Sequence, residues 1–464
     1  MPLAKSCDFV QRFFLRLQTM TGLSEVYCIM VRDNMKLKWI TLQDFRGIEK
    51  LTLALNGKTT VLFGINGVGK SSILRAVDLL YANIIAKLIG TGKIRTAKLD
   101  CDDISYGKSQ ANINAVFSFE DGTDMQYGCS FGRAAGKKHN IAELKLLADK
   151  FEDSYLVKGH DDGNGNWIEE ADYKNMPVFV NYGVNRIVLD VPVRASKEQF
   201  VKLDAFDKAI ESTIDFRNLF KWFRNQEDLE NQAKVRDNSD YEDKSLAAVK
   251  RAMLAMLDGF DDIHIDRKPL AMKVRKDGEY LTINQLSDGE KCTIALFGDL
   301  ARRMALANPE RENPLEGTGV VLIDELDLHM HTSWQRKVLG VLKNTFPNVQ
   351  FIITTHSPQI LGEADDTLNL LYMFKEEKKI SMKSYQSFMG WDTNVILEEV
   401  MNTDSVNQNM KRMLDKLYLY IEEKKFEQAE ELADVLDEKS NGYAQGVAKA
   451  RILISRGRRR EKNQ

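Results

Sequence analysis

The chain has 464 residues, which is enough for two or three ordinary domains or for one large domain with insertions. Hydrophobic residues make up 43% and charged residues 29%, and no apolar run approaches the roughly 18 residues that a membrane helix needs, so we exclude a membrane protein. The 65 basic and 68 acidic residues give a net charge of −3, so contact with nucleic acid would depend on a local patch. The 5 cysteines are scattered without a CxxC spacing, which indicates reduced thiols in a cytoplasmic protein without a zinc site.

The chain starts with an extension, residues 1–34, whose apolar residues fall on one helical face and which lacks the features of a secretory signal. We interpret it as a short docking helix or a loosely held arm. Residues 35–63 alternate apolar and polar side chains on both sides of a turn at Phe45-Arg46-Gly47. This pattern predicts a β-hairpin that leads into a glycine-rich segment.

The glycine-rich segment Val61–Ser72 has the GxxxxGK[ST] spacing of a P-loop, with an apolar strand before it and a helix after it. Glycines such as Gly67 and Gly69 let backbone N–H groups surround an anion. Lys70 can reach the terminal phosphates of a nucleotide, and the Ser71 hydroxyl can bind Mg²⁺. The alternative, a glycine-rich turn that binds nothing, leaves the flanking strand and helix unexplained. The segment therefore predicts a site for ATP and Mg²⁺.

Strands are the expected structure for most of the region after the P-loop helix. Residues 113–119 and 125–130 form two alternating runs around the turn Glu120-Asp121-Gly122, and we expect further strands as far as Val157. A short apolar strand follows at residues 177–181. This order predicts a β subdomain between the P-loop and the second half of the chain.

The second half begins with helices and then alternates strands and helices. Residues 197–260 have helical patterning with a polar interruption at 236–244, and they lack the heptads of a long coiled coil. Strand-like residues 263–283 follow, and two apolar strands are expected at 320–323 and 350–353. Alternation of strand and helix predicts a parallel sheet, in which ligands bind at the carboxyl ends of the strands.

Polar residues stand at those strand ends. Asp324 can hold Mg²⁺ through its water shell, and Glu325 can accept a proton from an attacking water. His356 can donate a hydrogen bond to a γ-phosphate, whereas a histidine taken alone is more often an ordinary surface or core residue. Ser287 and Gly289 open a predicted helix whose N-terminal dipole favours phosphate. The order and spacing of these residues argue against coincidence and predict ATP hydrolysis.

Four segments carry a resemblance to a known group of proteins. Gly64–Ser71, Leu286–Lys291, Asp324–His331 and Thr354–Pro358 resemble the Walker A, signature, Walker B with D-loop, and switch-histidine motifs of ABC-type ATPases of the RecF, SMC and OLD group. The resemblance covers roughly residues 35–385. It implies that the four segments meet at one nucleotide site.

Within the group, the run Asp324–His331 followed by Trp334-Gln335, together with Gly390-Trp391-Asp392-Thr393, is most similar to the PtuA ATPases of Septu anti-phage systems and to related retron ATPases. The chain departs from relatives at three positions, and none of these differences removes a catalytic group. Asp288 and Glu290 stand where transporter cassettes have Gly and Gln, and Thr332 stands where many relatives have Pro.

The resemblance implies an α/β fold, namely an ABC-type P-loop ATPase head with an antiparallel β subdomain, a short helical insertion and a C-terminal helical region. The expected divisions are an extension at 1–34, an N-lobe with P-loop and β subdomain at 35–196, a helical insertion at 197–260, a C-lobe at 261–388, and a helical region with a basic tail at 389–464. It further implies a homodimer, or a higher homo-oligomer, in which Ser287 of one subunit completes the nucleotide site of the other.

The resemblance also assigns roles to single residues. The implied catalytic residues are Glu325 and His356; the implied nucleotide contacts are Arg46, Asn66, Gly67, Gly69, Lys70, Ser71, Ser72, Gln110, Ser287 and Gly289; the implied Mg²⁺ ligands are Ser71, Asp324 and Gln110. For Gln110 the alternative is an exposed polar residue without a role. A separate HNH-type nuclease subunit, similar to PtuB, is the implied partner, and contact with DNA is compatible with it.

Alternatives remain at this point. An OLD-like protein would itself be a nuclease with a Toprim domain, which needs acidic residues at strand ends. After His356, Asp365-Asp366 instead precedes an expected strand, and the remainder is mostly helical. An SMC-like or RecF-like DNA-repair ATPase is the second alternative, although the long coiled coil is missing. His329 and His331 with Asp327 could form a metal cluster, but their place matches the D-loop.

The last helices present one amphipathic face, and we leave open whether it packs on the ATPase core or binds a partner. That face carries Met410, Leu414, Leu417, Tyr418 and Ile421.

Overall fold

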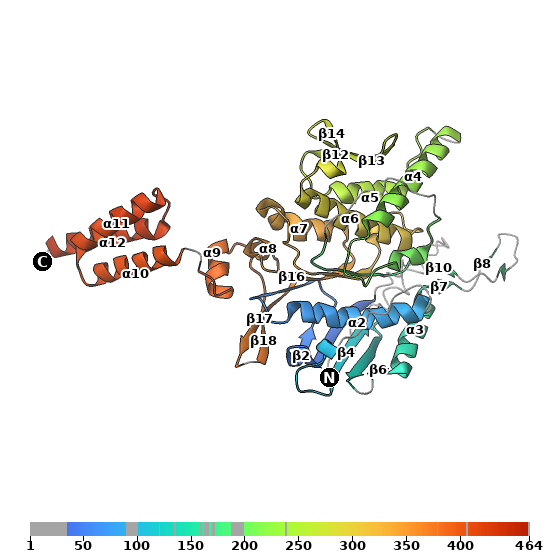
Figure 1. Ribbon diagram of the computed structural model, residues 1–464, viewed down its shortest axis with the longest axis horizontal. Coiled ribbons are helices and arrows are strands. Elements are labelled where there is room, and N and C mark those ends of the chain that lie inside the picture. The colour runs from blue at the N-terminus through green and yellow to red at the C-terminus, as the bar shows by residue number, and fades with distance from the viewer. Residues whose placement is uncertain are drawn as a thin grey trace, which may run out of the picture.

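The computed structural model describes residues 35–89, 101–119, 121–133, 136–157, 160–161, 167–168, 172–186, 199–236, 239–377, 379–404 and 407–462. The predicted N-terminal extension, residues 1–34, lies outside the described residues. The described chain is built around two sheets (Figure 1). A lobe of helices and short strands lies above the sheets in this view, and a group of C-terminal helices lies to one side. Within these ranges no helix combines the length and the apolar character that crossing a membrane requires.

The central element is a six-stranded sheet in the order β11-β15-β16-β3-β17-β18. Its strands are β3 (Thr60–Gly64), β11 (Val178–Tyr182), β15 (Gly319–Ile323), β16 (Val349–Thr355), β17 (Asn369–Glu376) and β18 (Lys379–Tyr385). All neighbouring strands run parallel except the edge pair β17 and β18. Every residue of β3, β11, β15 and β16 is buried, which explains their continuous apolar runs. The carboxyl ends of β3, β15 and β16 therefore lie side by side.

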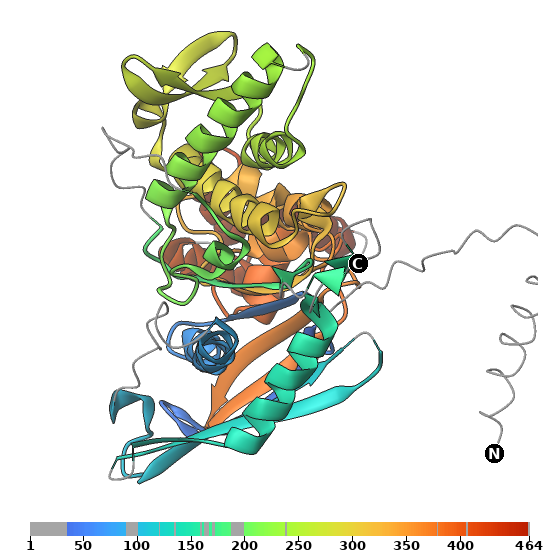
Figure 2. The same cartoon turned by 90° about the vertical axis from the view of Figure 1, so that its right-hand side faces the viewer.

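Helices cover both faces of this sheet. Helix α2 (Lys70–Ile89) lies on one face, and α6 (Asp288–Ala307) and α7 (Thr332–Thr345) lie on the other (Figure 1). Tyr81 of α2 stacks on Phe179 of β11 and meets Phe117 of the second sheet edge to face, with ring centroids 4.5 and 5.7 Å apart. Helix α2 is thus packed between the two sheets, as its end-on view in Figure 2 shows.

The second sheet is antiparallel and has the order β2-β1-β4-β5-β6. Its strands are β1 (Lys36–Phe45), β2 (Ile48–Ala54), β4 (Gln110–Ser118), β5 (Asp124–Gly132) and β6 (Gly136–His139). The hairpin that the sequence predicts before the P-loop is confirmed by the pairing of β1 with β2. Together the two sheets and their helices confirm the predicted α/β head with an antiparallel β subdomain.

The expectation of further strands as far as Val157 holds for β6 and for residues 156–157 but is wrong between them, because Ile141–Tyr155 forms helix α3. Asn140 caps this helix by accepting a hydrogen bond from the backbone N–H of Glu143. The buried residues Leu147, Phe151 and Tyr155 recur every four positions, which is the period of a helix face and not of a strand.

The predicted helical insertion packs on α6. Helices α4 (Phe216–Arg236) and α5 (Lys244–Leu254) confirm helices on both sides of the expected interruption, whereas residues 199–215 form a 3₁₀ turn and irregular structure in place of the expected helix. Gly298 of α6 lets them approach, because a Cβ there would lie 2.8 Å from Leu219 and 3.0 Å from Met253. A three-stranded sheet follows, made of β12 (Phe260–Arg267), β13 (Leu270–Lys276) and β14 (Glu279–Thr282).

Short elements complete the body. They are β7 (Leu156–Val157), β8 (His160–Asp161), β9 (Trp167–Ile168), β10 (Asp172–Tyr173), α8 (Pro358–Gly362), α9 (Thr393–Val395), the π turn Ile396–Val400, and the 3₁₀ turns Cys101–Asp103, Lys202–Phe206, Ile283–Gln285 and Pro314–Glu316.

The C-terminal helices form a unit with its own core, which projects from the body in Figure 1. They are α10 (Gln408–Glu422), α11 (Phe426–Ser440) and α12 (Gln445–Lys462). The amphipathic face of α10 around Leu417 packs on α11 and α12. Neither of the two expected alternatives, packing on the ATPase core or binding a partner, therefore describes this face. Three short amphipathic helices bury their apolar faces against one another because each alone is too short to be stable.

Candidate functional site

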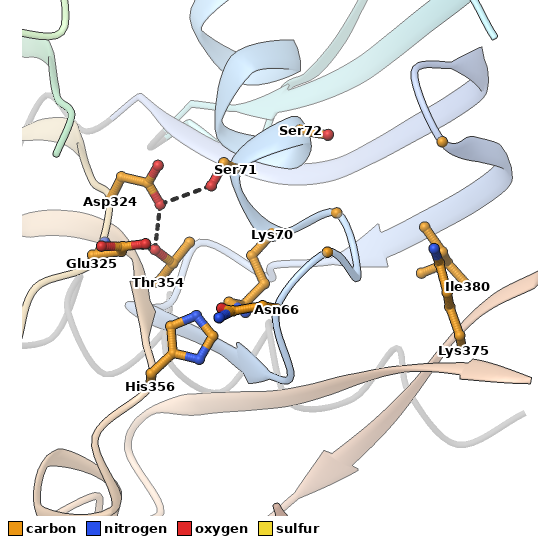
Figure 3. A pocket seen from close by; sticks show the side chains of 13 residues that line it. Asn66, Lys70, Ser71, Ser72, Asp324, Glu325, Thr354, His356, Lys375 and Ile380 are labelled. Atoms are coloured by element: carbon orange, nitrogen blue, oxygen red, sulfur yellow. Dashed lines mark hydrogen bonds between the residues drawn. The ribbon is translucent and has the colours of Figure 1, made fainter. Parts of the chain in front are cut away.

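A cleft of about 300 Å³ opens at the carboxyl edge of the parallel sheet (Figure 3). Its lining residues are Gly47, Asn66, Gly67, Gly69, Lys70, Ser71, Ser72, Asp324, Glu325, Thr354, His356, Lys375 and Ile380. The structure therefore brings together the predicted residues of the P-loop, of the end of β15 and of the loop after β16. The lining residues that were not predicted as site residues are Gly47, Thr354, Lys375 and Ile380.

The loop between β3 and α2 needs glycine for two different reasons. Gly67 and Gly69 have φ values of 77° and 93°, which side chains rarely adopt. Gly64 passes so close to β17 that a Cβ would lie 2.2 Å from the carbonyl oxygen of Met373. The loop ends where α2 begins at Lys70, so the unpaired N–H groups of the first helical turn face the cleft. This geometry fits a bound phosphate.

Lys70 lies under this loop and is almost fully buried. Its ammonium donates hydrogen bonds to the carbonyl oxygens of Gly64 and Ile65, at 2.9 and 3.0 Å. Burial lowers the pKa of Lys70 to about 8, although the nearby carboxylates of Asp324 and Glu325 oppose this shift. The side chain is thus a partly desolvated cation whose attraction for phosphate is strong.

Ser71 and Asp324 face each other at one end of the cleft. The Ser71 hydroxyl donates to Oδ1 of Asp324 at 3.2 Å, and the Thr354 hydroxyl donates to the same oxygen (Figure 3). A hydroxyl and a carboxylate are the oxygen ligands that Mg²⁺ prefers beside a nucleotide. The donor set therefore fits a divalent cation at this end of the cleft.

Glu325 follows Asp324 and has a backbone in the left-handed region, with a φ of 48°. Its N–H donates to the Thr354 hydroxyl at 2.7 Å. The guanidinium of Arg186 donates to the carbonyl oxygens of both Asp324 and Glu325, the first at 3.1 Å. Sequence reasoning missed Arg186, although its place just after a strand that pairs with β15 offers a signal.

His356 lies beside Lys70 in the cleft (Figure 3). Burial and the charge of Lys70 lower the pKa of His356 below its ordinary value, so the ring is neutral near pH 7 and can donate one N–H. Asp327 holds the backbone there, because it accepts hydrogen bonds from the Thr355 hydroxyl at 2.6 Å and from the His356 N–H at 3.2 Å.

Of the two histidines near Asp327, His331 has a structural contact of its own. His331 caps α7, and its Nδ1 lies 2.8 Å from the Ser333 hydroxyl. Among the described residues no group of three or more His, Cys, Asp or Glu side chains is arranged to hold a metal ion.

Ser287 and Gly289 lie apart from the cleft lining. Ser287 is exposed and caps α6 in a reciprocal pair of hydrogen bonds with Glu290. Gly289 lies against the segment after Glu325 that contains His329, which matches the D-loop of the related ATPases. A Cβ at Gly289 would lie 2.5 Å from the carbonyl oxygen of His329. Neither residue lines the cleft of its own chain.

Arg46 and Gln110 are also absent from the lining. The Arg46 guanidinium forms an ion pair with Asp103, at 2.8 Å, whereas the neighbouring Gly47 does line the cleft. Gln110 is exposed at the first position of β4, opposite Gly132 of β5. Their predicted nucleotide and Mg²⁺ contacts stay predictions.

The site has a buried lysine beneath a glycine loop and a hydroxyl paired with a carboxylate. It also has acidic and histidine side chains at the ends of adjacent parallel strands. Together these features define a P-loop ATPase. The family model described as "AAA domain, putative AbiEii toxin, Type IV TA system" matches residues 59–362, more than half of the chain. The chain belongs to this family.

Curated relatives agree with the site. The chain is 29% identical over 392 residues to Retron Vc95 probable ATPase of Vibrio cholerae serotype O1 biovar El Tor, covering 73% of this chain and 74% of the relative. It is 28% identical over 432 residues to Retron Ec83 probable ATPase of Escherichia coli, covering 78% and 75%. It is 23% identical over 382 residues to Septu protein PtuA of Bacillus thuringiensis, covering 81% and 86%. The predicted resemblance to retron and Septu ATPases is confirmed, and the chain is an ATPase.

Proposed function

We propose that this chain is the ATP-binding and ATP-hydrolysing subunit of a cytoplasmic anti-phage defence complex, that it dimerises head to tail, and that it controls a separate HNH-type nuclease similar to PtuB. Its similarity to proteins named for retrons and for Septu supports the defence role. The observation that carries the hydrolytic role is the arrangement of Lys70, the Ser71 and Asp324 pair, and Glu325 around one cleft.

In the proposed reaction the β- and γ-phosphates of ATP occupy the P-loop. The Lys70 ammonium leaves the carbonyl oxygens of Gly64 and Ile65 and binds phosphate oxygens instead. The Ser71 hydroxyl and Asp324 would hold Mg²⁺, which would supply positive charge beside the phosphates. These contacts orient the γ-phosphate toward the end of β15.

Glu325 accepts a proton from a water whose oxygen attacks the γ-phosphorus, and the bond from that phosphorus to the β,γ-bridging oxygen breaks. The neutral ring of His356 donates its N–H to a γ-phosphate oxygen as negative charge redistributes. The products are ADP, inorganic phosphate and a proton.

A head-to-tail dimer is supported by the exposure of Ser287 and by its absence from the lining of its own cleft. The N-terminus of the twenty-residue helix α6 offers free N–H groups to a phosphate bound by a second subunit. In this proposal DNA contacts belong to the assembled complex, because the net charge of −3 provides no global attraction.

Steady-state hydrolysis of ATP with Mg²⁺ tests the catalytic part. Glu325→Gln should keep ATP binding but lose roughly 10²–10⁴-fold in kcat, because it removes the general base alone. Lys70→Ala should weaken ATP binding as well. Glu363→Gln, an exposed glutamate outside the cleft lining, is the matched control and should turn over normally. Near-normal turnover by Glu325→Gln would remove Glu325 from this role.

A further inference from the structure

Arg186 is a charged residue buried at the edge of the site, with only 3% of its surface exposed. It follows the exposed residues Val184 and Asn185 and turns back under the loop after β15. A buried guanidinium requires hydrogen-bond acceptors. Here it finds the carbonyl oxygens of Asp324 and Glu325, two consecutive peptide groups.

Those peptide groups carry the proposed general base in a conformation that needs support. Glu325 has a φ of 48°, and a left-handed backbone at a residue other than glycine persists only where its surroundings hold it. The Thr354 hydroxyl fixes the N–H of Glu325, and Arg186 fixes its carbonyl oxygen. The backbone of Glu325 is therefore held on both sides, by groups from two different strand ends.

Arg186 also contacts the helix that Ser287 caps. Its carbonyl oxygen accepts a hydrogen bond from the thiol of Cys292 on α6, with a sulfur to oxygen distance of 3.2 Å. The same end of α6 touches the D-loop, because Gly289 lies against the carbonyl oxygen of His329. A displacement of the start of α6 would thus act on the segment after Glu325 directly and on Glu325 itself through Arg186.

We infer that Arg186 is a positioning residue, which orients Glu325 for proton abstraction and couples that orientation to the first turns of α6. This inference rests on the proposed function, since it takes Glu325 as the general base. Arg186 makes no contact with the nucleotide in this account and does not line the cleft. Its loss should therefore act on kcat through Glu325 and should leave ATP affinity nearly unchanged.

The test is a double-mutant cycle in the full-length protein, measured as ATP turnover at saturating ATP. Arg186→Met should lower kcat by roughly 10–100-fold, because a displaced catalytic group loses its near-attack geometry, and it should change the Kd for ATP by less than about 3-fold. Arg186→Lys keeps the charge but reaches fewer acceptors, so its loss should be smaller. Glu325→Gln with Arg186→Met should be no slower than Glu325→Gln alone, because the two residues act as a unit.

A merely structural role predicts a different pattern. The losses of Arg186→Met and Glu325→Gln would then multiply, and ATP affinity would fall together with the melting temperature. Arg267→Met is the matched control. Arg267 pairs with Glu227 and Asp228, none of which lines the cleft, and its effect should combine multiplicatively with Glu325→Gln.

Two outcomes separate this inference from the proposed function. If Glu325→Gln is slow but its loss multiplies with that of Arg186→Met, the inference is overturned and the proposed function stands. If Glu325→Gln turns over normally, Glu325 loses the role of general base in the proposed function, and the inference falls with it. Should Arg186→Met fail to fold, as judged by circular dichroism, the same cycle with Arg186→Lys decides by the same criterion.

Discussion

At the scale of single residues, the properties of the cleft depend on a lysine whose charge is only partly stabilised. Lys70 is buried, and its acceptors in the free protein are two neutral carbonyl oxygens. Burial places its pKa at about 8, whereas an exposed lysine titrates near 10.5. Bound phosphates would stabilise the ammonium and raise this pKa. Binding of ATP should therefore be linked to the protonation of Lys70.

This linkage predicts that ATP affinity falls as the pH rises. Because the bound form holds the Lys70 proton more tightly than the free form, the Kd should increase above pH 8, by at most about tenfold per pH unit. The Kd is measured between pH 6.5 and 9.5 in the Glu325→Gln background, in which ATP is consumed slowly. Lys70→Arg is the control, since a guanidinium stays charged throughout this range. Identical pH profiles for the two proteins would rule out Lys70 as the titrating group.

Most residues of the site could be predicted because local motifs carry them. The P-loop is one short run of consecutive residues, and the acidic pair after β15 is another. The parallel sheet then brings the two runs together, because both follow the carboxyl ends of its strands. Arg186 could not be assigned in the same way, because its partners are backbone carbonyl oxygens 138 and 139 positions away, and these leave no pattern of side chains in the sequence. Ile380 was missed because it reaches the cleft from the edge hairpin β17–β18.

At the scale of elements, the P-loop is built against β17 as well as around the phosphate site. Gly64 and Gly67 both have positive φ, but only Gly64 meets a neighbouring backbone, where a Cβ would lie 2.2 Å from the Met373 carbonyl oxygen. A Cβ at Gly67 has nothing within 4 Å. Substitution of Gly64 therefore tests how the loop packs against β17, and substitution of Gly67 tests the backbone conformation that would bind phosphate.

Gly64→Ala should lower the melting temperature by at least about 3 °C more than Gly67→Ala does, because it adds a collision between β3 and β17 to the strain that a positive φ imposes at both positions. Gly67→Ala should act mainly on ATP binding. Thermal unfolding followed by circular dichroism without nucleotide gives both values. Equal shifts would mean that β17 can move away from the loop at little cost.

Element types followed from the sequence where the periodicity was unambiguous. The continuous apolar runs of β15 and β16 identify buried parallel strands, and the interruption between α4 and α5 is visible as a polar stretch. Helix α3 was mistaken for strands because it follows two hairpin strands and because the four-residue spacing of its buried side chains was overlooked. The sequence predicts the amphipathic face of α10, but it does not predict that this face packs on α11 and α12.

At the scale of the whole molecule, the position of Ser287 is the main argument for a second subunit. It is exposed, it opens a long helix, and it lies apart from the lining of its own cleft. If it acts on the nucleotide of a partner, a variant that lacks Ser287 and a variant that lacks Lys70 should complement each other.

Ser287→Arg and Lys70→Ala should each be inactive alone, and their mixture should regain up to about a quarter of the wild-type ATPase activity, since half of the dimers are mixed and each mixed dimer has one complete site. Lys70→Ala mixed with a chain that carries both substitutions is the control and should stay inactive. Subunit exchange is verified with differently tagged chains. Failure to regain activity despite exchange would contradict a composite site.

The central claim is that this chain hydrolyses ATP and controls a nuclease that it does not itself contain. Asp365, the acidic residue that an OLD-like nuclease would need, is paired with Lys343 in a turn before β17, at 3.3 Å. The most direct measurement is cleavage of DNA with Mg²⁺ or Mn²⁺ by the purified chain, with and without an HNH-type nuclease similar to PtuB. The account predicts intact DNA for the chain alone and cutting only with the nuclease, modulated by ATP and altered in Lys70→Ala. Metal-dependent cutting by the chain alone that persists in Lys70→Ala and disappears in Asp365→Asn with Asp366→Asn would contradict it.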